Sequence, residues 1–127
     1  MEFIGKIDIE KYKVITADIK TDEVVITEER REHIRLEHPG DYELMAPHFE
    51  SALATPDYIF EDENHPGNTG LILKRIEKGN LRFRMVLRLH TSSDPGGYKN
   101  SILSAWVISE SRWKNYVDNK KILYRFE

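Results

Sequence analysis

The sequence predicts an α+β domain in which helices cover one face of an antiparallel sheet. Two observations support this fold class. Residues 81–89 alternate apolar and mostly basic side chains with the two-residue period of a strand. Residues 27–38 have the pattern of a helix that Thr27 caps and that Pro39-Gly40 ends. Helical segments followed by consecutive strands are the order expected of an α+β domain.

The segments before residue 57 are expected to be extended first and helical afterwards. Residues 3–7, 12–15 and 24–26 have the composition of short extended segments. A second helix is predicted over residues 42–54, where apolar residues recur at helical spacing. Pro47 either belongs to the first turn of that helix or divides the segment in two.

The remaining chain is predicted to supply most of the sheet. Strands are expected at residues 58–60, 71–76, 81–89 and 101–108, with a hairpin turn at 77–80, and a last edge strand at 121–125 follows a short helix that Ser109 caps. The apolar face of residues 81–89 should meet the helices, which leaves its arginine face open. We therefore expect a sheet of four to five antiparallel strands with two N-terminal helices on one face. The whole chain, residues 1–127, should form one domain, in which extended segments at 1–26 precede a core at 27–127.

Composition narrows the classes of protein. The chain has no cysteine, which rules out disulfides and thiolate zinc sites. The charged N-terminus does not resemble a signal peptide, and no apolar run is long enough to span a bilayer, so a cytoplasmic address is expected, including for a phage-encoded or delivered protein. Residues 1–70 hold 7 Lys/Arg and 17 Asp/Glu, whereas residues 71–101 hold 7 Lys/Arg and 2 Asp/Glu. This asymmetry favours one anion-attracting surface, and the alternative is that the charges lie on solvated strand faces.

Several segments together resemble a known nuclease superfamily. They are ITEERREHIRLEHPGDYE, ATPDYIFEDENHPGNTGLILKR, LRFRMVLRL, YKNSILSAWVIS and NKKILYRFE. In order and spacing they are similar to the phage-associated branch of the barnase–EndoU–colicin–RelE-like nucleases, over roughly residues 24–127. The resemblance implies N-terminal helices against a four-stranded antiparallel sheet whose exposed face is the active face. It also implies a metal-independent ribonuclease without a cofactor, in which the 2′-hydroxyl of RNA attacks the adjacent phosphate.

This chemistry needs an acid, a base and cations, and five residues are candidates for these roles. His33 matches the helical histidine of the family, although it is as readily explained as a packing residue. Arg84 and Arg88 project from one strand face, at most about 13 Å apart, where they bind phosphate or pair with carboxylates. Ser104 stands where relatives often carry Thr, and by strand alternation it should share a face with Ile102 and Trp106. Lys99 is a further candidate for stabilising the transition state.

Five more residues are candidates for binding substrate: His38, Arg82, Ser101, Trp106 and Tyr124. His38 has an alternative role at the helix C-terminus, where the helix dipole favours a histidine. Trp106 either stacks a base or packs on the sheet. The positions of His65 and His90 are left open. His33 and His38 are five residues apart instead of four and have no obvious third ligand, so no metal site is expected.

Three classes of function remain open at this stage. The first is an endoribonuclease, with RNA as substrate and an antitoxin or immunity protein as partner. The second is an inactive nuclease fold that only binds RNA or a protein. The third is an interaction module or structural accessory. The sequence does not set the oligomeric state.

Overall fold

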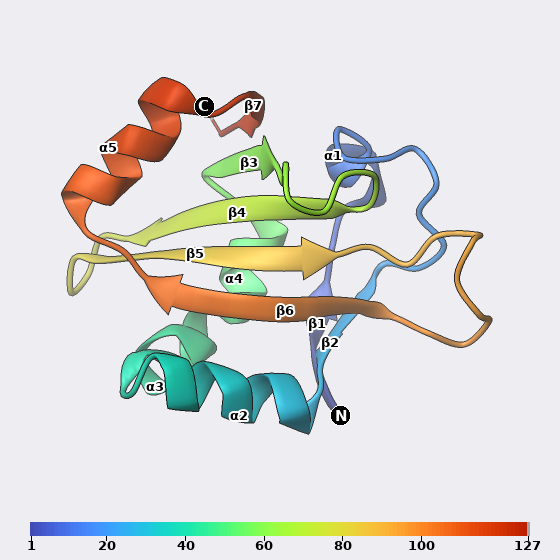
Figure 1. The fold of residues 1–127 in the computed structure, drawn as a ribbon, viewed down its shortest axis with the longest axis horizontal. Coiled ribbons are helices and arrows are strands. Elements are labelled where there is room, and N and C mark those ends of the chain that lie inside the picture. Colours follow the sequence, from blue (N-terminus) through green and yellow to red (C-terminus); the bar gives the residue numbers. More distant parts are fainter. Residues whose placement is uncertain (127) are drawn as a thin grey trace.

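The computed structural model describes residues 1–126, which form a seven-stranded sheet with short helices around it (Figure 1). The strand order is β1-β2-β6-β5-β4-β3-β7. The strands are β1 (Glu2–Lys6), β2 (Glu23–Ile26), β3 (Tyr58–Glu61), β4 (Thr69–Ile76), β5 (Leu81–Arg88), β6 (Asn100–Val107) and β7 (Ile122–Arg125). The helices are α1 (Ile9–Tyr12), α2 (Glu28–Glu37), α3 (Asp41–Met45), the 3-10 helix η1 (Ala46–His48), α4 (Phe49–Ala54) and α5 (Glu110–Asn119).

The fold class is confirmed as α+β, but the sheet is larger than predicted and is mixed. The N-terminal segments join it as β1 and β2, and β2 runs parallel to β6 while all other neighbours are antiparallel. Val24 and Ile26 are fully buried, so pairing β2 with the sheet removes apolar surface from water. The prediction of four to five antiparallel strands was therefore wrong in its count and in its uniform direction.

The predicted extended segment at residues 12–15 was also wrong. Tyr12 ends the one-turn helix α1, in which the Asp8 carboxylate accepts the backbone N–H of Glu10 as an N-cap, and residues 13–15 form a turn. The helix brings Tyr12 into the core, where its hydroxyl donates to the Leu53 carbonyl at 2.7 Å. Burial raises the pKa of the Tyr12 hydroxyl far above its usual range, so the group remains a donor.

The second predicted helix is divided, as one of the two interpretations of Pro47 required. The segment runs as α3, η1 and α4, with Pro47 inside η1. Proline has no N–H to donate back along a helix and its ring clashes with the preceding turn, so a continuous helix is interrupted there. The three pieces still bury Tyr42, Met45, Phe49 and Leu53 on one face of the sheet.

Helices lie on both faces of the sheet, which corrects the predicted one-face arrangement. The larger core lies between one sheet face and the N-terminal helices, and Phe83, Met85 and Leu87 of β5 belong to it, as predicted for the apolar face. On the opposite face α5 covers a smaller apolar cluster with Trp113 and Tyr116. The arginine face is therefore covered at the α5 end, whereas α2 runs beside β6 (Figure 1).

A bulge in β6 determines which of its side chains reach the arginine face. Val86 lies opposite Ser104 and Leu87 opposite Ile102, so Leu103 is one extra residue in β6. Ser104 and Trp106 share the face of Arg84, as the Arg84–Trp106 pairing shows, whereas Ile102 points into the larger core. The predicted common face of Ser104 and Ile102 was wrong, because strand alternation fails across a bulge.

We expect Tyr12→Phe to lower the free energy of unfolding by about 1–3 kcal/mol, because it leaves the buried Leu53 carbonyl without its donor. Urea denaturation of the variant and the wild type measures this difference. Tyr98→Phe is the control, since Tyr98 is 59% exposed. Equal midpoints for all three proteins would show that the bond does not stabilise the fold.

Candidate active site

The candidate site is a hollow of about 280 Å³ on the arginine face, where α2, the loop after β3, β5 and β6 meet. Ten residues line it: Arg30, His33, Asp62, Asn64, His65, Arg84, Val86, Leu103, Ser104 and Trp106. Four of these residues, His33, Arg84, Ser104 and Trp106, are candidates from the sequence. The hollow therefore combines two imidazoles, two guanidinium groups and one carboxylate in one concave surface.

Helix α2 supplies Arg30 and His33 from one of its faces. Thr27 caps the helix by accepting the backbone N–H of Arg30 at 3.1 Å. Ile34 is the buried residue of the helix and packs in the larger core. Arg30 and His33 are three residues apart, so they are neighbours on the helix surface. Because Ile34 anchors the helix in the larger core, the side chains of Arg30 and His33 face the hollow.

The loop after β3 supplies a histidine whose ring is oriented by a carboxylate. Nδ1 of His65 lies 3.1 Å from Oδ2 of Asp62. The other carboxylate oxygen accepts the backbone N–H of Asn64 at 3.1 Å, which fixes the Asp62 side chain. The side chain of Asp62 is 6% exposed and that of His65 is 66% exposed. The carboxylate is therefore a buried support, and the imidazole is available to a ligand.

Arg84 is held in place by two aromatic side chains. Its guanidinium carbon lies 3.6 Å from the centre of the Trp106 ring, and its Nη1 donates to the Tyr116 hydroxyl at 2.7 Å. His38, at the end of α2, stacks on Trp106 with ring centres 4.9 Å apart. Because β5 and α2 lie on opposite sides of β6, Trp106 lies between Arg84 and His38. This packing orients the guanidinium before any anion arrives.

The other sequence candidates do not line the hollow. Arg88 pairs with Asp94 at 2.5 Å, and Lys99 pairs with Glu23 at 2.7 Å. Ion pairing lowers the pKa of the Glu23 carboxyl, chiefly through the hydrogen bond from Lys99. The three remaining candidates lie as follows: Arg82 is paired with Glu110, Ser101 stands opposite Arg88, and Tyr124 packs against the larger core. Their roles in substrate binding stay predictions.

Arg30, Asp62 and Asn64 line the hollow but were not predicted from the sequence, and the position of His65 was left open. Asp62 and His65 are three residues apart in a polar loop with Pro66 and Gly67, a spacing that lets a carboxylate contact a histidine inside a turn. The spacing of Asp62 and His65 was the one local feature of the sequence that could have indicated this contact. The position of the loop over the arginine face depends on sheet pairing and could not be seen locally.

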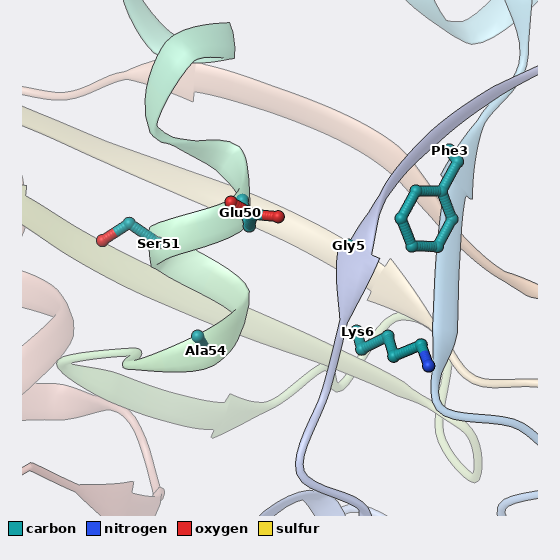
Figure 2. Close-up of a pocket in the computed structure, with 6 residues that line it drawn as sticks. All are labelled: Phe3, Gly5, Lys6, Glu50, Ser51 and Ala54. Carbon is teal, nitrogen blue, oxygen red and sulfur yellow. The ribbon is translucent and has the colours of Figure 1, made fainter.

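A larger hollow, of about 530 Å³, lies between β1 and α4 (Figure 2). Its lining contains Phe3, Gly5, Lys6, Glu50, Ser51 and Ala54. A Cβ on Gly5 would lie 3.1 Å from the Glu50 side chain, so the strand and helix approach closely there. This hollow has one cation and no imidazole among its lining residues, so its chemistry suits acid–base work less well than the smaller hollow on the arginine face.

The concave surface carries imidazole and guanidinium groups on one face of the sheet, and such groups are suited to binding phosphate. The family model described as phage-Barnase-EndoU-ColicinE5/D-RelE like nuclease2 matches residues 1–125. The chain belongs to this nuclease family, which confirms the resemblance found in the sequence. The match begins at residue 1, so it includes β1 and α1, which precede the residues covered by the sequence resemblance. Neither the curated proteins nor the solved structures yield a match to the chain.

Within residues 1–126, no helix has the length and apolar character needed to cross a membrane. Within the same residues, no group of three or more His, Cys, Asp or Glu side chains is arranged to hold a metal ion.

The Arg88–Asp94 pair predicts a specific loss of stability in acid. A backbone N–H of Thr91 and the Arg88 guanidinium lower the pKa of the Asp94 carboxyl. Because the pKa of Asp94 is lower in the folded state than in the unfolded state, its ionised form stabilises the fold. This stabilisation is fully present above the unfolded-state pKa of about 4, and it is lost as the pH falls through the folded-state pKa. We expect wild type to exceed Asp94→Asn in urea midpoint at pH 7, with the gap closing below about pH 4.

The matched control for this measurement is Asp118→Asn, an exposed carboxylate on α5. A gap between wild type and Asp94→Asn that stays constant from pH 7 to pH 2.5 would contradict the proposed ionic origin.

Proposed function

We propose that this protein is an endoribonuclease that cleaves RNA by attack of the 2′-hydroxyl on the adjacent phosphate. One observation carries the proposal: His33, His65 and Arg84 line a single hollow on the sheet of a chain that belongs to a nuclease family. An acid, a base and a fixed cation are the three groups that this reaction needs.

In the proposed mechanism His65 is the general base. Its exposed imidazole removes the proton from the 2′-hydroxyl, and the Asp62 carboxylate at 3.1 Å stabilises the imidazolium that forms. The O2′–P bond forms as the P–O5′ bond breaks. His33 then protonates the leaving 5′ oxygen, which yields a 2′,3′-cyclic phosphate and a 5′-hydroxyl end. Both protons are accounted for by side chains of the hollow.

Arg84 and Arg30 stabilise the additional negative charge on the phosphorane oxygens. Arg84 is already fixed by Trp106 and Tyr116, so little reorganisation is needed when the charge develops. The Ser104 hydroxyl, which the β6 bulge turns toward the hollow, is available to donate to a phosphate oxygen. The proposed mechanism needs no metal ion, because side chains supply the acid, the base and the positive charge.

An inactive fold that only binds RNA or a protein is the second candidate. The observation that favours it is the run of exposed carboxylates on α2, Glu28, Glu29, Glu32 and Glu37, beside the hollow. Carboxylates repel the phosphates of a long RNA, so they restrict how the strand approaches. An antitoxin or immunity protein as partner remains a prediction from the family resemblance.

We expect metal-free cleavage of a fluorogenic RNA in the presence of EDTA, with a rate that falls about 10²–10⁴-fold in His33→Ala and in His65→Ala. Arg84→Ala should lose about 10²–10³-fold, as removal of one donor to a developing oxyanion does. His48→Ala and Arg112→Ala are matched controls, because neither residue lines the hollow. RNA binding without cleavage by wild type would support the binding module instead.

The two-histidine mechanism also predicts a bell-shaped dependence of kcat/KM on pH. The base must be neutral and the acid protonated, so the rate falls on both sides of an optimum. His65→Ala should remove the acidic limb of the profile, whereas His33→Ala should remove the basic limb. A stopped assay across pH 4.5–9 tests the assignment, and loss of the opposite limbs would exchange the two roles.

A further inference from the structure

The hollow between β1 and α4 is lined by residues with small side chains where the strand and the helix approach (Figure 2). A Cβ at Gly5 would lie 3.1 Å from the Glu50 side chain, so this position of β1 faces α4 without a side chain of its own. Helix α4 adds the small side chains of Ser51 and Ala54. The hollow of about 530 Å³ therefore has room for a side chain from another molecule.

Exposed apolar side chains lie beside this hollow. Phe3 lines it and is 54% exposed, and Met1, two residues earlier, is 84% exposed. Strand β1 is the first in the sheet order, so among the strands of residues 1–126 it pairs with β2 alone. Exposed apolar surface at the edge of a sheet is a feature of protein–protein contacts, because docking removes it from water.

The two sides of the hollow carry opposite charges. Lys6 lies on β1 and Glu50 on α4 (Figure 2), and among residues 1–126 neither side chain takes part in an ion pair. A partner with charges of one sign would be repelled by one of the two sides. A second copy of the chain, related by a two-fold axis, brings the positive side of each copy to the negative side of the other. A surface that complements itself in this way is what a closed dimer requires.

We propose that the hollow between β1 and α4 is the interface of a symmetric homodimer, in which Phe3 of each copy enters the hollow of the other and Lys6 of each copy pairs with Glu50 of the other. Burial of Phe3 favours association, and the two ion pairs select the orientation. The inference is independent of the proposed ribonuclease function, because the two hollows have no lining residue in common.

Sedimentation velocity measures the oligomeric state over a series of protein concentrations up to about 100 μM. Wild type should sediment as a dimer in the upper part of this range. The dimers of Lys6→Glu and Glu50→Lys should each be at least about tenfold weaker, because a like-charge pair replaces each ion pair. Lys121→Glu and Glu77→Lys make the same charge changes outside the hollow and should leave the dimer unchanged.

Mixing the two charge variants tests the contact itself. Lys6→Glu has a carboxylate on both sides of its hollow, and Glu50→Lys has an ammonium group on both sides. Only the mixed dimer joins opposite charges at both contacts, so the mixture should associate at least about tenfold more tightly than either variant alone. A variant that had failed to fold would not show this gain.

Phe3→Ala tests the apolar part of the interface. The substitution should weaken the dimer at least about tenfold, because it removes the side chain that fills the hollow of the other copy. Leu44→Ala is the matched control, since Leu44 is 57% exposed on α3 and does not line the hollow. Far-ultraviolet circular dichroism checks that both variants are folded.

Three results would overturn the dimer. The first is a wild-type protein that is monomeric at every concentration. The second is a dimer that persists unchanged in both charge variants, because another face would then hold it. The third is a mixture of the charge variants that associates no better than its components. None of these results depends on RNA cleavage, so failure of the dimer and failure of the ribonuclease are distinguishable.

Discussion

One extra residue in β6 determines how the arginine face is built. The bulge at Leu103 keeps Ile102 and Ala105 in the larger core while it turns Ser104 and Trp106 to the other side of the sheet. In a strand with strict alternation, Ile102 and Ser104 would share a face, so Ile102 could not be in the core while Ser104 faces the hollow. The bulge therefore reconciles a buried strand with a site on its outer face, which is a common use of bulges near active sites.

Trp106 extends this constraint to the neighbouring elements. Its ring contacts Arg84 of β5 on one side and His38 of α2 on the other. Arg84 is tied in addition to Tyr116 of α5, so side chains of three consecutive elements, β5, β6 and α5, meet at one guanidinium. A cation held in this way loses little conformational entropy when it binds an anion, which is the physical basis of its proposed role.

The sequence was sufficient to predict those features that depend on local pattern. The N-cap at Thr27, the hairpin before β5 and the helix that Ser109 begins are all present as predicted. The failures have non-local causes. Pairing of β2 with β6 joins residues 76 positions apart, Val24 with Asn100, and no local pattern of four residues can specify it. Residues 12–15 look extended by composition, yet the buried Tyr12 ends the helix that Asp8 caps, and residues 13–15 form a turn.

The same division applies to the candidate site. His33 was predicted from the family resemblance and Arg84 from the alternation of its strand, and both line the hollow. His65 could not be placed, because its loop reaches the arginine face only through the pairing of β3 with β4. Arg88 and Lys99 looked equally suitable in the sequence, but their carboxylate partners come from a loop and from β2.

The central claim is that imidazole and guanidinium groups act on one RNA phosphate by way of the neighbouring 2′-hydroxyl. Mass spectrometry of the ends produced from a short RNA by the wild-type protein in EDTA tests it most directly. The account predicts 2′,3′-cyclic phosphate and 5′-hydroxyl ends, and no cut where the attacking 2′-hydroxyl is replaced by hydrogen. Ends with 3′-hydroxyl and 5′-phosphate groups, or cleavage at the deoxy position, would contradict it.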